Sequence, residues 1–121
     1  MAFDRGLEER LHDYFQNRHD LIVKKIFGGL CFMLSEHMCC AVIGDKLMAR
    51  VGLENYIDCL SKPHVTEMDF TGKPIKGLVY VLPAGFESDI DLIYWLNLCV
   101  GFADSLPPKS PKVFKQPKKK K

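Results

Sequence analysis

The feature that most restricts the fold is a block of four short apolar segments between residues 22 and 51. Segments 22–27, 30–34, 38–43 and 46–51 are rich in β-branched, aromatic and other apolar residues, and runs of this length and composition are typical of strands. Their connections are too short for crossovers, so neighbouring strands can pair only as hairpins. The block therefore predicts an antiparallel meander.

The first connection of this meander contains Gly28 and Gly29. Paired glycines supply the positive φ angles that a tight hairpin requires, so we predict a structural turn there. A phosphate-binding loop is the alternative. It is disfavoured because no Gly-x-x-x-x-Gly-Lys-Ser/Thr or Gly-x-Gly-x-x-Gly pattern follows, and because strand-like segments flank the pair on both sides.

Helical spacing flanks and interrupts the strands. Apolar residues recur at intervals of three and four over residues 4–17, 53–60 and 89–106, which predicts three helices. Asp4 is the expected N-cap of the first helix, and Ser88 is the expected N-cap of the last. Two further strand segments lie at 65–70 and 78–82. The predicted order is α-β-β-β-β-α-β-β-α, which indicates an α+β fold, a two-layer sandwich of helices on an antiparallel sheet.

The last helix is apolar around most of its circumference. Besides its main face, it has five apolar residues that lie off the core stripe, and a helix of this kind is usually covered on both sides. If these five apolar side chains faced water, they would form a patch large enough to indicate a partner. We therefore expect an unidentified protein partner or a second copy of the chain, most simply a homodimer, on these interface candidates: Ile90, Ile93, Tyr94, Leu98 and Val100.

Charge divides the chain at Pro108. Residues 1–108 contain ten Lys and Arg against fifteen Asp and Glu, a net charge of −5, whereas residues 109–121 contain seven lysines and no acid. The sequence predicts a folded domain over 1–108 and a disordered Lys/Pro-rich tail over 109–121. An acidic domain argues against a nucleic-acid-binding face on the fold. The tail offers weak, non-specific contact with nucleic acid or an acidic partner, mainly through Lys118, Lys119, Lys120 and Lys121.

The sequence indicates no catalytic, cofactor or metal site. His37, Cys39 and Cys40 are close in sequence, but adjacent strand residues point to opposite faces and would not reach one ion. The five cysteines all lie in apolar patterns, as buried thiols do, and a thiol enzyme using Cys31 or Cys39 remains an alternative. With neither a signal peptide nor an apolar run of spanning length, we expect a cytoplasmic protein without membrane contact.

Several ordered segments together resemble one known family. They are residues 3–11, 24–33, 37–40, 44–52, 68–81 and 105–108, and they include Ile26-Phe27-Gly28-Gly29-Leu30-Cys31-Phe32 and Gly44-Asp45-Lys46-Leu47-Met48-Ala49-Arg50. They resemble the N-terminal domain of the TfoX/Sxy family over about residues 2–108. The resemblance implies a compact α+β domain of the kind also seen in secretion chaperones.

Full-length members of that family are regulators of competence genes with a second, helical domain. The resemblance therefore implies a stand-alone N-terminal domain without the C-terminal domain, and it supplies no catalytic residues. We expect a non-catalytic regulatory or protein-interaction module that acts by protein–protein contact. The alternative is a nucleic-acid-associated accessory protein attached through its Lys-rich tail.

Overall fold

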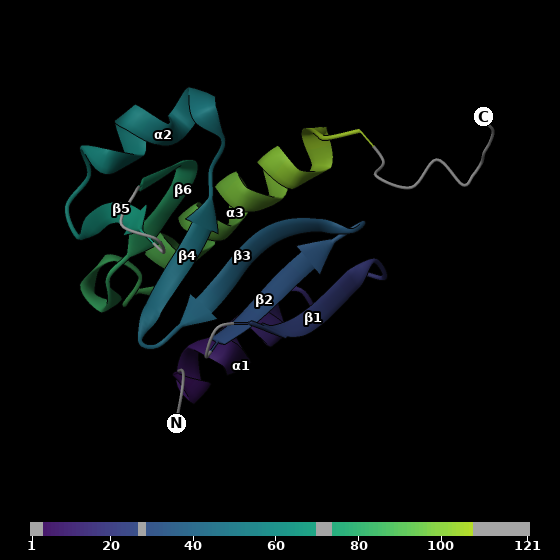
Figure 1. Cartoon of the computed structure of the whole chain (residues 1–121). Coiled ribbons are helices and arrows are strands. Elements are labelled where there is room, and N and C mark those ends of the chain that lie inside the picture. Colours follow the sequence, from purple (N-terminus) through teal and green to yellow (C-terminus); the bar gives the residue numbers. More distant parts are fainter. Residues whose placement is uncertain (1–3, 27–28, 70–73, 108–121) are drawn as a thin grey trace.

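A computed structural model describes residues 4–26, 29–69 and 74–107 (Figure 1). Within these ranges one sheet of six strands is accompanied by three α-helices and one 3₁₀ turn. The predicted α+β class and element order are confirmed. In chain order the elements are α1 (Arg5–Tyr14), β1 (Leu21–Ile26), β2 (Gly29–Leu34), β3 (His37–Ile43), β4 (Lys46–Arg50), α2 (Leu53–Leu60), β5 (Val65–Asp69), β6 (Pro74–Val81), η1 (Pro83–Gly85) and α3 (Asp89–Ser105).

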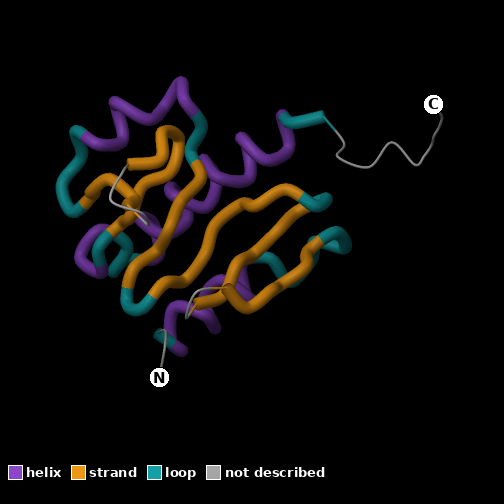
Figure 2. The backbone as a smooth tube through the Cα atoms, in the orientation of Figure 1, coloured by secondary structure: helices purple, strands orange, loops and turns teal. Residues whose placement is uncertain are grey.

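The sheet is antiparallel throughout, with the strand order β1-β2-β3-β4-β6-β5. Its first four strands form the predicted meander, and Figure 2 shows the chain leaving β4 through α2 before it returns as β5 and β6. The later strand, β6, pairs with β4 and leaves β5 at the edge. The carbonyl oxygen of Gly77 in β6 accepts from Val51 N at 2.9 Å and Gly52 N at 3.2 Å, which attaches the start of α2 to the sheet.

Side-chain caps define where the two longer helices begin. Asp4 Oδ1 accepts from the backbone N–H of Gly6 at 2.8 Å, and Ser88 Oγ accepts from that of Asp91 at 3.1 Å, so both predicted N-caps are confirmed. Helix α1 ends at Tyr14, three residues before the predicted end. In the part of the chain that the structure describes, no helix is long and apolar enough to cross a membrane.

Helices α1 and α3 cover the same face of the sheet and lie behind it in Figure 1. One cluster of buried side chains joins them to the strands and also includes Tyr56 and Cys59 of α2. Its largest fully buried members include Phe15 after α1, Phe32 in β2 and Leu96 in α3. This main core therefore occupies only one side of the sheet.

Gly29 begins β2, where it pairs with Ile26 of β1 and Ile43 of β3. A Cβ at this position would come within 2.1 Å of the carbonyl oxygen of Val42, so the glycine permits β2 and β3 to approach closely. Gly28 and the tail 109–121, with Lys118 to Lys121, lie outside the described residues.

Candidate interaction surfaces

The outer side of α3 presents apolar side chains to solvent. Ile90, Ile93 and Tyr94 are 81%, 45% and 42% exposed, while residues on the opposite side of the helix, such as Trp95 and Leu96, are buried. Asn97 and Gly101 continue the exposed line at helical spacing, and a Cβ added at Gly101 would meet no atom within 4 Å. We call Ile90, Ile93, Tyr94, Asn97 and Gly101 the α3 stripe.

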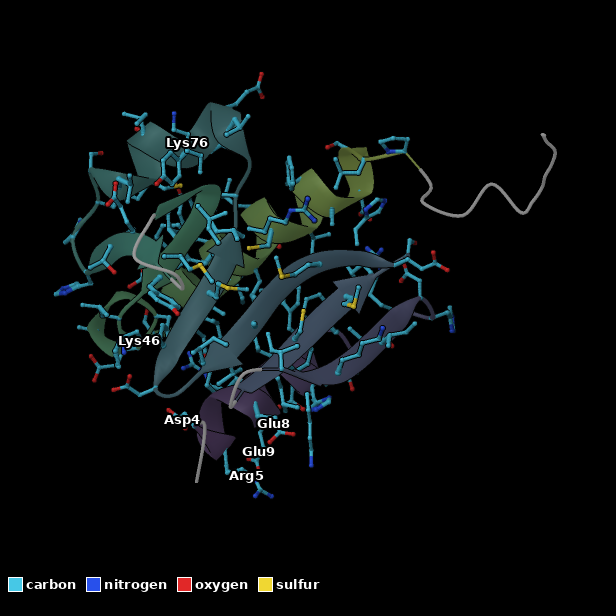
Figure 3. The ribbon with its side chains drawn as sticks, viewed as in Figure 1. Asp4, Arg5, Glu8, Glu9, Lys46 and Lys76 are labelled. Carbon is cyan, nitrogen blue, oxygen red and sulfur yellow. The ribbon has the colours of Figure 1, made fainter. Side chains whose placement is uncertain are left out.

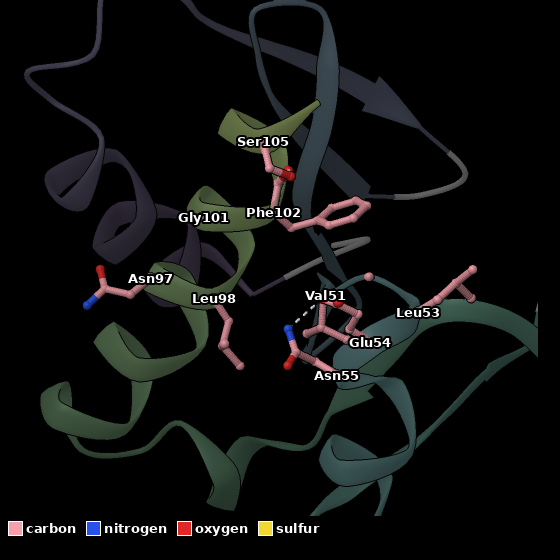
Figure 4. A pocket seen from close by; sticks show the side chains of 10 residues that line it. Val51, Leu53, Glu54, Asn55, Asn97, Leu98, Gly101, Phe102 and Ser105 are labelled. Carbon is pink, nitrogen blue, oxygen red and sulfur yellow. Dashed lines mark hydrogen bonds between the residues drawn. The ribbon is translucent and has the colours of Figure 1, made fainter. Parts of the chain in front are cut away.

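The other two interface candidates, Leu98 and Val100, lie elsewhere. Both are half-buried against the main core. Leu98 also lines a groove of about 510 Å³ between α2 and α3, together with Asn55 and Phe102 (Figure 4). Asn55 Nδ2 donates to the carbonyl oxygen of Val51 at 3.1 Å at one side of this groove. Two residues of the α3 stripe, Asn97 and Gly101, also line this groove, so the stripe and the groove overlap along α3.

The second face of the sheet is a separate apolar surface. Its buried cluster consists of strand residues alone, namely Cys31, Ala41, Met48, Met68 and Leu78. Half-buried side chains from the same face surround this cluster: Ile26, Met33, Met38, Ile43 and Tyr80. Figure 1 shows this face toward the viewer, with no labelled helix in front of it. We call it the open face.

Positive charges collect on the open face. Lys24 pairs in register with Cys31, Lys46 Nζ lies 5.9 Å from the centroid of the Tyr80 ring, and Arg50 lies within electrostatic range of Cys31. Lys76 lines a cleft on the same face. The net charge of −5 over residues 1–108 is therefore an average over a basic sheet face and acidic helices.

The acids are concentrated on the helices. Figure 3 shows Asp4, Glu8 and Glu9 at α1, far from Lys76. Lys46 lies nearer to them, because the backbone N–H of Asp4 donates to the carbonyl oxygen of Gly44 at 2.7 Å. The other acidic residues of the helices and their caps are Asp13, Glu54, Asp58, Asp89, Asp91 and Asp104. The two layers of the sandwich consequently carry opposite charge.

A cleft of about 510 Å³ lies where the open face meets the start of α2. Met33, Met38 and Leu78 line it from the strands, and Leu53 and Phe102 line it from the helices. We call it the Arg50 cleft, because the half-buried side chain of Arg50 also lines it. Arg50 Nη1 donates to the carbonyl oxygen of Met38 at 3.3 Å, and its guanidinium carbon lies 5.2 Å from the centroid of the Phe102 ring.

Three cysteines meet between β3 and α3. A register shift in the β2–β3 pairing makes Cys39 an extra residue, so Cys39 and Cys40 both belong to the main core instead of pointing to opposite faces. Hydrogen bonds from Cys40 and Cys99 lower the pKa of Cys39 to about 5, against the effect of burial. Hydrogen bonding to Cys39, together with burial, raises the pKa of Cys40 and of Cys99 well above the usual value of a thiol.

This thiol cluster is closed to substrates. All five cysteines are free and buried, and Cys39, Cys40 and Cys99 have no exposed surface. His37 Nε2 instead hydrogen-bonds the carbonyl oxygen of Pro107 at 2.7 Å. Among the described residues no group of three or more Cys, His, Asp or Glu side chains is placed to hold a metal ion.

Arg18 links three parts of the chain that are distant in sequence. Its Nε and Nη2 donate to both carboxylate oxygens of Asp20 at 2.9 Å, and its Nη1 and Nη2 donate to Asp104 of α3 at 3.1 and 3.0 Å. Ser35 Oγ, in the β2–β3 turn, donates to Asp20 at 2.6 Å. These contacts hold the pKa of Asp20 far below its usual value and fix the end of α3 to the sheet.

Sequence reasoning missed Arg50 and the open face. The signal was present, because Lys24, Met48 and Arg50 alternate with residues of the main core. Both faces of the central strands are apolar, however, so alternation alone could not distinguish a covered face from an open one.

A family model described as the TfoX N-terminal domain matches residues 13–103, well over half of the chain. No curated protein and no solved structure matches this amino-acid sequence.

Proposed function

The chain belongs to the TfoX N-terminal domain family, and on that premise we propose that it is a non-catalytic regulatory module that acts by protein–protein contact. The observation that supports contact is the α3 stripe, where Ile90 and Ile93 are exposed to solvent and Tyr94, whose ring centroid lies 5.2 Å from Lys62 Nζ, is partly exposed. Exposing such side chains together is unfavourable, and contiguous apolar patches typically mark interaction sites.

A second copy of the chain is the partner that the α3 stripe fits best. Helix α3 has 17 residues, and its length of roughly 25 Å is enough for two copies to pack along each other across a two-fold axis. The apolar side chains would then bury one another, and the open space at Gly101 permits close approach of the paired helix. Homodimerisation through α3 is therefore part of the proposal.

Light scattering behind size exclusion tests this pairing at two protein and two salt concentrations. We expect a dimer that persists in high salt, because apolar association is not screened. The double variant Ile90→Ser/Ile93→Ser should be monomeric. The matched control is Leu53→Ser/Ile57→Ser, which removes two residues of α2 that are 69% and 73% exposed and should stay dimeric. A wild-type monomer up to high micromolar concentration, or a dimeric stripe variant, would refute the pairing.

A nucleic-acid-associated role through the tail is the second candidate. Seven lysines and no acid in residues 109–121 favour it. Oligonucleotide binding that falls steeply with salt and disappears when residues 109–121 are deleted would support this role. Partner binding that survives the deletion supports the interaction module.

A further inference from the structure

The open face combines an apolar surface with cations, most of which form no ion pair within the described residues. Of Lys24, Lys46, Arg50 and Lys76, only Lys46 forms an ion pair within the described ranges, with the adjacent Asp45 at 3.6 Å. Acids that could neutralise the others lie mainly on the helices. The face thus has an excess of positive charge that the domain itself leaves largely uncompensated.

Arg50 is the most informative of these cations. It is half-buried, and desolvating a guanidinium is unfavourable unless its donors are satisfied. A guanidinium has five N–H donors, yet one side-chain hydrogen bond, to Met38, is formed within the described residues. Stacking over Phe102 orients the group without using its donors. The arrangement leaves Arg50 ready to receive a carboxylate at the edge of an apolar cleft.

The apolar part of the surface is suited to side chains of a peptide. Every methionine within the described residues lies on this face, with Met33 and Met38 half-buried in the Arg50 cleft. Thioether side chains are flexible and polarizable, and they are common on surfaces that adapt to bound helices. The cleft volume of about 510 Å³ accommodates several apolar side chains.

We propose that the open face is a docking surface for an acidic amphipathic segment of another protein. Apolar side chains of that segment would enter the Arg50 cleft, and its carboxylates would pair with Arg50, Lys24 and Lys76. This surface is distinct from the α3 stripe, so docking does not require the homodimer. The partner's chemistry follows from charge complementarity, because an acidic segment supplies the counter-charges that the face lacks.

Two other occupants fit the surface less well. A single-stranded nucleic acid would use several free aromatic faces for stacking. The described part of this surface has Tyr80 on the sheet and Phe102 in the cleft, and Phe102 already stacks against Arg50. A second copy docking by its own acidic helices would form a heterologous contact, which builds open chains rather than a closed assembly. A different protein is therefore the occupant that we infer.

Methionine-methyl NMR of the full chain tests the proposal directly, since Met33, Met38, Met48 and Met68 all report on this face. The probe is a set of synthetic amphipathic peptides that have Leu or Ile at helical spacing and Glu between them. The comparison peptides have Lys in place of every Glu. We expect the acidic peptides to shift the Met33 and Met38 methyl signals and the Lys peptides to leave them unchanged.

Adjacent lysines of β1 provide a matched pair of variants. Lys24 pairs with Cys31 on the open face, whereas Lys25 pairs with Leu30 on the opposite face, and both are exposed. Lys24→Gln should weaken peptide binding several-fold, and Arg50→Gln should weaken it about tenfold or more. Lys25→Gln should leave it unchanged. Because Lys24 and Lys25 are exposed, neither exchange threatens folding.

Three outcomes would overturn the proposal. They are equal binding of acidic and Lys peptides, equal effects of Lys24→Gln and Lys25→Gln, and unshifted methionine signals at millimolar acidic peptide. Shifts caused by a single-stranded oligonucleotide but not by the peptides would assign the face to nucleic acid instead. Dimer mass measured on Arg50→Gln keeps this result separate from the α3 pairing, which that variant leaves intact.

Discussion

At the scale of single residues, the Arg18–Asp20–Asp104 network makes a specific prediction about acid stability. The folded pKa of Asp20 lies below its ordinary value, so its carboxylate stabilises the fold above about pH 4 and loses this effect as pH falls. Asp20→Asn should lower the free energy of unfolding at pH 7 by about 1–2 kcal/mol. The difference from wild type should shrink below pH 4.

Urea unfolding at pH 7 and in a series down to pH 3 measures this difference. Glu9→Gln is the control, because Glu9 is exposed on α1 and forms no ion pair in the described ranges. It should change stability by less than about 0.5 kcal/mol. A constant difference between wild type and Asp20→Asn across the pH series would contradict the assignment of Asp20.

The buried thiols make a second prediction at the residue scale. Hydrogen bonding lowers the pKa of Cys39 to about 5, but Cys39 has no exposed surface, so reagents cannot reach it without opening of the structure. A thiol-specific chromogenic reagent at pH 7 should react slowly with all five cysteines and rapidly after addition of denaturant. One thiol reacting at the rate of a free cysteine in the native protein would revive the thiol-enzyme alternative.

At the scale of elements, two glycines should respond oppositely to alanine. Gly29→Ala would bring a Cβ to 2.1 Å from the carbonyl oxygen of Val42, so β2 and β3 must separate. We expect a loss of about 3 kcal/mol or more in unfolding free energy. Gly101→Ala meets no atom and removes a helix-destabilising residue, so it should raise stability by about 0.5–1 kcal/mol. Thermal unfolding monitored by circular dichroism compares them, and similar losses for both would contradict this account.

The elements that sequence predicted well are those with local signals. Asp4 and Ser88 mark helix starts because a cap needs only the next three residues. The position of β6 between β4 and β5 has no such signal, because it depends on how α2 packs and on the contact of Gly77 with Val51. The β-bulge at Cys39 likewise depends on pairing with β2, so parity along the chain assigned Cys39 and Cys40 to different faces.

At the scale of the whole molecule, the sandwich has one covered and one uncovered sheet face. The acidic helices bury the main core, and the open face presents Met33, Met38 and uncompensated cations. A formal charge of +2 for the whole chain conceals this arrangement, because the seven lysines of 109–121 offset the acidic helices. The two contacts that we propose, at the α3 stripe and at the open face, use different residues, so neither would exclude the other.

This one-sided packing also predicts how stability is distributed over the sheet. Strands β3 and β4 are paired on both sides and lie against α3, whereas β1 and β5 are edge strands paired on one side. Amide hydrogens in β3 and β4 should therefore exchange only through global unfolding. Those of β1 should exchange through local opening, which has a lower free energy. Native-state hydrogen exchange measures this directly. If β1 amides were protected as strongly as those of β3, this account of how stability is distributed over the sheet would be contradicted.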